Sequence, residues 1–350
     1  MKKIFFCGGG SAGHVVPNIA IMRALAGRYE LGYIGTSGIE YGLVRREGIK
    51  FYTISAPKLD RGRLLSNLTL PCRLKESVQE ARTILQREEP CLLFCKGGYV
   101  SLPPALAAKK LGIPVIAHES DLSPGLANKI ISRFSAVTLT SFPETAEKFR
   151  NGRYSGPPVR KEALRSSRAR AKQKFGIDER PTILVFGGGS GSQKINAAIR
   201  AAARGLCERY NILHLCGKGN RADAHIDGYL QIEFADDMGE IYACADYAVA
   251  RAGSNSAFEL IINGIPTLFI PLENGSTRGD QPKNARYFER AGLCRVLRER
   301  ELTPERLKVE IAKLTSDENI RRNLIGCGMS CGNDRIVFEI ERTAIYSKNS

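Results

Sequence analysis

Two glycine-rich segments of this chain could bind phosphate groups. The first glycine turn, GGGSAGH at residues 8–14, follows the apolar run 3–7, and the second glycine turn, GGGSGS at residues 187–192, follows the apolar run 182–186. Glycine lets the main chain come close to a diphosphate, and the helix after such a turn offers unpaired N–H groups to the anion. The pattern therefore predicts two sites for phosphorylated ligands.

The first glycine turn also matches the G-x-G-x-x-G fingerprint of dinucleotide-binding folds. A NAD site requires an acid at the end of the next strand to hold the ribose hydroxyls, but residues 33–36 contain none and Glu40 arrives late. The second glycine turn lacks the third glycine, and neither turn has the Gly-Lys-Ser/Thr of a P-loop. An NAD-dependent dehydrogenase is therefore the last of the alternatives.

Polar residues follow two further strand-like runs, in CKGGYVS at 95–101 and in AHESD at 117–121. The carboxyl ends of strands hold the ligand in open parallel sheets, and polar groups there would be costly to bury without a task. The alternative is that Ser120 and Asp121 cap the next helix. The residues that we expect to contact a substrate or the reacting atoms here are Tyr99, His118, Glu119 and Asp121.

A third polar segment, RAGSNSAFE at 251–259, follows the apolar run 247–250 in the second half of the chain. Residues 254–256 can cap a helix, which would place Glu259 within its first two turns. The carboxylate of Glu259 then either supports that cap or accepts hydrogen bonds from a ribose diol. Both alternatives remain open from the residues alone.

The chain has 52 Lys and Arg against 36 Asp and Glu, a formal net charge of +16, which favours anionic partners. Nucleic acid is disfavoured because aromatic residues are few and no known nucleic-acid-binding module occurs. Ten scattered cysteines without zinc spacing predict reduced thiols in a cytosolic protein and no metal site. No signal peptide or run of about 18–20 apolar residues is present, so a soluble or peripheral protein is expected.

Strand-like and helical segments alternate along the whole chain, which predicts an α/β fold with parallel sheets. At 350 residues, two domains are expected, and the repeat of strand and glycine turn suggests two copies of one architecture. Helices are expected after each glycine turn and at 103–111. Further strands are expected at 31–34, 51–54, 91–95, 114–117, 136–140, 212–216 and 267–270.

Residues 150–174 have nine basic residues, one acid and the pair Pro157-Pro158, a composition that predicts a solvated linker between the domains. The apolar spacing of residues 335–346 predicts an amphipathic helix. We expect that helix to pack back on the first domain.

Eight motifs occur in the order and spacing of the MurG-type transferases, and the chain resembles that family over nearly its whole length. The motifs are GGGSAGHVVPN, CKGGYVS, AHESD, GPPVR, FGGGSGSQKIN, FADDM, RAGSNSAFE and DQPKNA. The resemblance implies two Rossmann-like doubly wound domains facing across a cleft, the GT-B glycosyltransferase architecture. It places an acceptor domain at 1–160, with the helix 335–350 packed on it, and a UDP-N-acetylglucosamine domain at 161–334.

The resemblance also implies a role for individual residues. The first glycine turn would approach the donor sugar and the acceptor diphosphate, with the histidine as candidate base; the residues concerned are Ser11, Ala12, Gly13 and His14. The donor diphosphate would meet Gly189, Ser190 and Arg160. Uracil would contact the main chain of Ala235, and the sugar hydroxyls would contact Gln281. Diphosphate and ribose would be held by Ser254, Asn255, Ser256, Ala257, Phe258 and Glu259.

Three residues depart from the family pattern. Ala12 stands where glycine is usual, and Asp121 stands where asparagine is usual, so an amide that can donate is replaced by a carboxylate that only accepts. In the second glycine turn the serine comes one place later, at Ser190. The contacts to the donor sugar are the ones that these changes affect.

The activity implied is inverting transfer of N-acetylglucosamine from its UDP donor to undecaprenyl-diphosphate-N-acetylmuramyl pentapeptide, that is, lipid I to lipid II. One base is needed, and His14 is the first candidate because an unperturbed imidazole titrates near neutrality, with Glu119 second. The helix after the second glycine turn and Arg160 would stabilise the departing UDP. No Asp-x-Asp motif presents itself for a metal, and no cofactor is expected.

The lipid acceptor implies a peripheral protein at the cytoplasmic face of the membrane. Residues 58–75 mix basic and leucine residues, as an interfacial segment against anionic lipid would, although an ordinary amphipathic helix is the alternative. The expected partners are UDP-N-acetylglucosamine, the undecaprenyl-linked N-acetylmuramyl peptide and an anionic membrane surface, with no nucleic acid. The alternative functions are a UDP-N-acetylglucosamine 2-epimerase and a non-catalytic protein that binds nucleotide sugars or lipid diphosphates.

Overall fold

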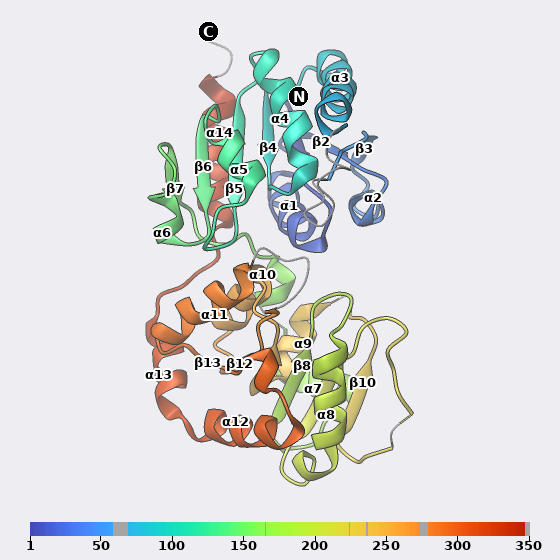
Figure 1. Ribbon diagram of the computed structural model, residues 1–350, viewed down its shortest axis with the longest axis vertical. Helices are drawn as coiled ribbons and strands as arrows, with labels where there is room; N and C mark the ends of the chain where they lie inside the picture. Colours follow the sequence, from blue (N-terminus) through green and yellow to red (C-terminus); the bar gives the residue numbers. More distant parts are fainter. Residues whose placement is uncertain (59–68, 165, 224, 236, 274–278, 347–350) are drawn as a thin grey trace. The chain divides into compact units, whose positions relative to one another are not determined.

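The structure is a computed structural model that describes residues 1–58, 69–164, 166–223, 225–235, 237–273 and 279–346 (Figure 1). Its described residues divide into two compact units, Met1–Arg160 together with the segment from Cys331 onward, and Lys161–Ser330. Each unit is an α/β domain built on a parallel sheet, which confirms the predicted fold class. No helix in the described ranges is long and apolar enough to cross a membrane.

The first unit contains a seven-stranded sheet in the order β3-β2-β1-β4-β5-β6-β7, with every neighbouring pair parallel. Its strands are β1 (Lys3–Cys7), β2 (Glu30–Gly35), β3 (Lys50–Thr53), β4 (Leu92–Cys95), β5 (Val115–Glu119), β6 (Val137–Thr140) and β7 (Gly152–Tyr154). The central strands β4 and β5 are buried along their whole length, because helices cover both faces of the sheet.

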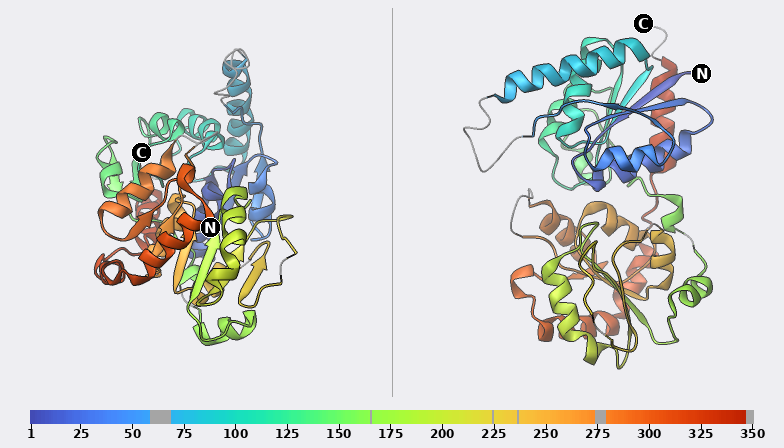
Figure 2. Two further views of the ribbon diagram at one scale, coloured as in Figure 1. Left: turned by 60° about the horizontal axis from the view of Figure 1, so that its bottom comes forward. Right: turned by 90° about the vertical axis from the view of Figure 1, so that its right-hand side faces the viewer.

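The helices of the first unit form two layers. One face of the sheet packs against α1 (Ala12–Leu25), α2 (Ile39–Arg45) and α14 (Asn333–Tyr346), and the other against α3 (Leu70–Glu88), α4 (Leu102–Lys110) and α5 (Leu126–Ile131). Figure 2 shows α3 and α14 on opposite sides of the sheet. Shorter helical segments are η2 (Tyr99–Ser101) and α6 (Pro143–Ala146).

Helix α14 returns from the end of the chain to the first unit and completes its core. Ile336 and Ile340 are fully buried there against α1. Asn333 fixes the start of the helix, since its side chain accepts a hydrogen bond from the Val159 N–H (3.0 Å) and donates one to the Val159 carbonyl (2.7 Å). The sheet of this unit is therefore covered by segments from both ends of the chain.

The second unit contains a six-stranded parallel sheet in the order β10-β9-β8-β11-β12-β13. Its strands are β8 (Thr182–Phe186), β9 (Asn211–Leu215), β10 (Tyr229–Ile232), β11 (Tyr247–Ala250), β12 (Thr267–Phe269) and β13 (Cys294–Val296). The helices are α7 (Arg168–Phe175), α8 (Gln193–Leu206), α9 (Met238–Cys244), α10 (Ser254–Ile262), α11 (Asp280–Arg290), α12 (Pro304–Ser316) and α13 (Glu318–Gly326), with the short turns η3 (Lys161–Leu164) and η4 (Glu299–Glu301).

In both sheets the strand order runs outward in opposite directions from the first strand of the unit. In the first unit the reversal lies between β1 and β4, and in the second between β8 and β11. The last residues of these strands are paired, Cys7 with Cys95 and Phe186 with Ala250. Ligands of open α/β sheets bind beyond the carboxyl ends of the strands at such a reversal. The two glycine turns begin directly after β1 and β8, so each stands at this position.

The boundary between the two units falls within residues 150–174, after Arg160, but most of this segment is not the solvated linker that was predicted. Its first residues form strand β7, which pairs with β6, and Ser155 through Val159 are buried beneath α14. Its last residues form α7, which packs on α9 through the buried Ala171. Arg168, Arg170 and Lys174 of α7 are exposed, so much of the charge of this segment reflects a helix surface and not an unstructured connection.

Candidate active site

Two buried side chains hydrogen-bond to the main chain where β1 enters the first glycine turn. Tyr33, on β2, donates its hydroxyl to the Gly8 carbonyl (2.8 Å). Asn18, on α1, donates to the Cys7 carbonyl (3.2 Å) and to the Tyr33 hydroxyl (3.1 Å). Burial raises the pKa of Tyr33 well above its usual range, so its hydroxyl remains a donor. The end of β1 therefore has one conformation set by its neighbours.

Glu40 holds the tip of the first glycine turn, a role that the sequence did not reveal. Its carboxylate is fully buried and accepts hydrogen bonds from the main-chain N–H of Gly10 (3.3 Å) and of Thr36 (3.0 Å). A Cβ at Gly9 would lie only 2.4 Å from this carboxylate, so a larger residue there would displace Glu40 from the turn. Glu40, which lies too far along the sequence to bind the ribose of NAD, thus orders the first glycine turn.

His14 and Ser11 stand together on the open side of this turn, at the start of α1. The Ser11 hydroxyl lies 2.9 Å from His14 Nδ1, and both residues are at least partly exposed. When Nδ1 carries the ring proton and donates it to Ser11, Nε2 keeps its lone pair and can accept a proton. The pair therefore has the geometry of an oriented base.

The glycines after β4 bring Tyr99 to the same place. Gly98 has a φ of +76°, and a Cβ on it would lie 2.6 Å from the Gly9 carbonyl oxygen and 3.2 Å from His14 Nδ1. The Tyr99 ring closes against Gly10, where a Cβ would lie 2.6 Å from the ring. Tyr99, Ser11 and His14 are thus brought together.

Ala12 occupies the position where the family usually has glycine. It is the first residue of α1 and has no positive φ; the positive-φ positions of this turn are Gly8 and Gly10. A methyl group is compatible with helical backbone. This departure therefore leaves the conformation of the turn intact.

The polar cluster at the end of β5 is buried. His118 has no exposed surface, and burial, followed by the charge of Lys96, lowers its pKa well below its ordinary value. Glu119 accepts hydrogen bonds from Asp121 N (3.0 Å), Gly125 N (2.8 Å) and Asn128 Nδ2 (2.9 Å), and burial raises its pKa. These contacts hold the loop between β5 and α5.

Lys96, the first residue after β4, is a second site residue that the motifs did not single out. Its side chain is 2% exposed and contacts the Ser120 hydroxyl. Burial lowers the pKa of Lys96 to about 8, while the carboxylates of Glu119 and Asp121 oppose that shift. Asp121, the residue in the usual place of asparagine, therefore balances a buried positive charge in this chain.

The second glycine turn is closely packed at its ends and open at its top. Gly191 has a φ of +77°, and a Cβ there would lie 2.1 Å from the Cys216 carbonyl oxygen. By contrast, no described atom lies within 4 Å of a Cβ built at Gly189, and Ser190 is exposed. Ser192 caps α8 by accepting the Ile195 N–H (3.5 Å). The turn thus presents glycine backbone and a helix N-terminus outward.

Arg251 ties this turn to the end of β11, and its role was also missed. Its buried guanidinium donates to the Ser192 hydroxyl (2.8 Å) and to the Ile270 carbonyl (3.0 Å) and contacts Glu299. Burial acts to raise the pKa of Glu299, but hydrogen bonds from Arg251 and Lys194 outweigh it and the pKa is lowered. Glu299 is therefore the charged partner that permits a buried arginine here.

The segment after β11 forms helix α10, whose N-cap is Gly253 without a side-chain capping bond. The alternative that residues 254–256 cap this helix is therefore wrong. Ser254, Ala257, Phe258 and Glu259 are buried, whereas Asn255 and Ser256 are half-buried. Glu259 accepts a hydrogen bond from the Tyr242 hydroxyl (2.7 Å), so one carboxylate oxygen is engaged within the unit.

The remaining predicted residues lie at the borders of these elements. Ala235 follows β10 and is half-buried. Gln281, in the first turn of α11, accepts the Leu272 N–H (2.9 Å), which leaves its amide N–H₂ facing away from that bond. Arg160 is half-buried and is the last residue of the continuous stretch of the first unit. Among the described residues, no group of three His, Cys, Asp or Glu could hold a metal ion.

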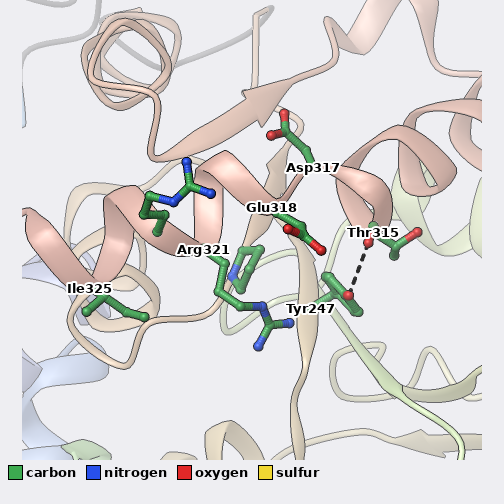
Figure 3. A pocket seen from close by; sticks show the side chains of 8 residues that line it. Tyr247, Thr315, Asp317, Glu318, Arg321 and Ile325 are labelled. Atoms are coloured by element: carbon green, nitrogen blue, oxygen red, sulfur yellow. Dashed lines mark hydrogen bonds between the residues drawn. The ribbon is translucent and has the colours of Figure 1, made fainter.

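A hollow on the second unit lies away from all of these residues. It is formed by α13 and the start of β11, where Tyr247 donates to the Thr315 carbonyl (3.3 Å) and Arg321 stacks over the Tyr247 ring (5.5 Å) (Figure 3). Because the glycine turn follows the carboxyl end of β8, parallel to β11, this hollow is at the opposite end of the sheet. It is not a candidate for the substrate site.

The two units match known protein domains. Residues 4–140 match the glycosyltransferase family 28 N-terminal domain, and residues 182–323 match the family 28 C-terminal domain. The chain is 42% identical over 322 residues to a UDP-N-acetylglucosamine–N-acetylmuramyl-(pentapeptide) pyrophosphoryl-undecaprenol N-acetylglucosamine transferase of Clostridium kluyveri, covering 90% of this chain and 91% of the relative. A transferase of the same name from Shouchella clausii is 43% identical over 323 residues, with 90% and 91% covered.

Solved structures share the fold at lower identity. MurG of Acinetobacter baumannii gives a TM-score of 0.76 at 23% identity, with 98% of this chain and 100% of that chain covered. A calicheamicin glycosyltransferase gives a TM-score of 0.75 at 15% identity, with 98% of each chain covered. Two doubly wound units, each with a glycine turn at its strand reversal, define a glycosyltransferase of the GT-B class. The chain belongs to the MurG-type transferases of glycosyltransferase family 28.

The buried Lys96 predicts a pH dependence of stability. The folded protein releases this proton near pH 8, whereas the unfolded chain holds it to about 10.5, so the unfolded state binds more protons between these values. Relative to Lys96→Met, the wild-type free energy of unfolding should therefore rise from pH 8 to 10.5, by up to about 3 kcal/mol. Urea unfolding at a series of pH values measures this difference.

The matched control is Lys110→Met, at an exposed lysine of the same unit. Its unfolding free energy should run parallel to that of the wild type over the same pH range. If the unfolding free energies of the wild type and Lys96→Met changed equally with pH, the pKa of Lys96 would not be lowered in the folded protein.

Proposed function

We propose that this enzyme transfers N-acetylglucosamine from UDP-N-acetylglucosamine to undecaprenyl-diphosphate-N-acetylmuramyl pentapeptide, converting lipid I to lipid II in peptidoglycan synthesis. The observation that carries the proposal is 42% identity to a transferase of this activity across 90% of the chain. The arrangement of the residues supports it, because each unit presents a glycine turn suited to a diphosphate and only the first carries an oriented histidine.

The two units divide the substrates in this proposal. The second unit binds the donor, with Gly189 and Ser190 at the diphosphate, Ala235 at uracil, residues 254–259 at diphosphate and ribose, and Gln281 at the sugar. The open main chain at Gly189 and the N-terminus of α8 support this assignment. The first unit, 1–160 with the C-terminal helix, binds the acceptor.

On the acceptor side, the proposed contacts are Ser11, Ala12, Gly13, Tyr99, His118 and Asp121. The exposure of Ser11 and Gly13 and the half-exposure of Tyr99 and Asp121 are consistent with direct contacts. The side chain of His118 is fully buried, so its contribution would be to order the end of β5 beneath the substrate.

The reaction is a single displacement at the anomeric carbon. The acceptor hydroxyl oxygen bonds to that carbon while the bond to the UDP oxygen breaks, and UDP leaves with the electron pair. His14 Nε2 takes the hydroxyl proton while its Nδ1–H donates to Ser11, so the imidazolium remains hydrogen-bonded. The N–H groups at the start of α8, together with Arg160, stabilise the charge on the diphosphate. Glu119 keeps its loop in place through three hydrogen bonds.

A lipid-linked acceptor requires the enzyme to reach the cytoplasmic face of the membrane, and we place it there as a peripheral protein. Residues 58–75 are the proposed contact with anionic lipid, although 59–68 lie outside the described residues. Within α3, Arg73 and Lys75 are exposed, as such a contact requires.

Radiolabelled UDP-N-acetylglucosamine and a lipid-linked N-acetylmuramyl pentapeptide test the function. The proposal predicts that label appears in the lipid fraction in a β-linked disaccharide. Label that stays in the aqueous phase as an epimerised sugar nucleotide would instead establish a 2-epimerase. Bound but unreacted substrates would establish a binding protein.

His14→Ala should lower kcat about 10²- to 10⁴-fold, because it removes the ring nitrogen that accepts the proton of the acceptor hydroxyl. UDP binding, measured by calorimetry, should be unchanged. Ser11→Ala should lower kcat less than His14→Ala does, since it removes the hydroxyl that orients the ring and keeps the ring itself. A normal kcat for His14→Ala would show that His14 is not the base.

Arg251→Met should weaken UDP binding at least about tenfold, since the variant releases Ser192 and leaves Glu299 without its closest partner. The matched control is Arg321→Met in the hollow of Figure 3, which should bind UDP as the wild type does. Calorimetry on folded samples of both variants makes the comparison. Equal affinities would show that the donor does not depend on the Arg251 bridge.

A further inference from the structure

A polar hollow of about 450 Å³ lies beside the first glycine turn, and none of the residues assigned above except Tyr99 belongs to it. It opens at the carboxyl ends of β2 and β3 and is bounded by α3 and η2. The polar side chains that line it are Thr36, Ser37, Thr53, Ser55, Glu80 and Tyr99.

Two residues join this hollow to the turn that carries the candidate base. Tyr99 lines the hollow, and its ring also closes against Gly10. Thr36 lines it too and donates its N–H to Glu40, which also accepts the Gly10 N–H. A substrate held at His14 therefore has this hollow directly beyond Tyr99.

The chemistry of the hollow is acidic and rich in hydroxyl groups, in a chain with a net charge of +16. Glu80 accepts hydrogen bonds from the Ser55 N–H (2.7 Å) and hydroxyl (3.0 Å), which fix its carboxylate at the wall. Such a carboxylate repels a diphosphate and attracts an ammonium group. Hydroxyl groups can both donate to and accept from peptide amides.

We propose that this hollow binds the peptide of the acceptor, with Glu80 pairing with an ammonium group on that peptide. The inference rests on the proposed function, in which the sugar that reacts at His14 also carries a pentapeptide. The peptide leaves that sugar beside the reacting hydroxyl, so it must lie within a few ångströms of the first glycine turn. The hollow beyond Tyr99 offers the matching charge and hydrogen-bonding groups.

Glu80→Gln tests the proposal, because it keeps an oxygen for the Ser55 N–H and removes only the charge. Three lipid-linked acceptors are compared: one with a pentapeptide that bears a free amine, one with that amine acetylated, and one without the peptide. KM for the free-amine acceptor should rise roughly fivefold, with kcat unchanged. KM for the other two acceptors should be the same for variant and wild type.

The matched control is Glu76→Gln, one helical turn earlier on α3 and also exposed, which should change none of the three KM values. An unchanged KM of Glu80→Gln for the free-amine acceptor would overturn the proposal. So would an equal rise for all three acceptors, since that is a structural effect. Failure of the wild type to transfer sugar to any of the acceptors would instead refute the proposed function.

Discussion

Backbone packed too closely for any residue but glycine is the constraint on which both sites depend. A Cβ at Gly98 would collide with the Gly9 carbonyl, and one at Gly191 would collide with the Cys216 carbonyl. This packing fixes the direction in which each turn leaves its strand. It thereby decides where the N–H groups, the start of α8 and the imidazole of His14 point. In each unit the glycine turn forms one wall of the site, at the point where the strand order of the sheet reverses.

Each of the buried charges Glu40, Lys96 and Arg251, at the carboxyl ends of the two sheets, has partners there. Glu40 is paired with main-chain N–H groups, Lys96 with a hydroxyl and nearby carboxylates, and Arg251 with Glu299. Burial of a charge is costly without such partners. That cost explains why Asp121 is acceptable in the usual place of asparagine, since Lys96 supplies the opposite charge.

Continuous apolar runs predicted the central strands well, and β1, β8 and β11 have the predicted bounds, because strands covered on both faces contain little polar sequence. The edge strand β3 was predicted, but the edge strands β7, β10 and β13 were missed; β7 and β13 are only three residues long and each contains an arginine. His14, Ser11 and Tyr99 were each predicted as site residues, and the structure brings the three together. The sequence could not predict Glu40, because its partner Gly10 lies 30 residues away along the chain and is reached only through the fold.

The central claim is that each glycine turn serves one substrate, the second the nucleotide donor and the first the lipid-diphosphate acceptor. Hydrogen exchange of the main-chain amides, followed by mass spectrometry with either substrate alone, tests it most directly. The account predicts that UDP slows exchange at residues 187–192 and 251–259 and that a short-chain acceptor slows it at 8–14 and 96–99. Protection of residues 8–14 by UDP, with no change at 187–192, would contradict it.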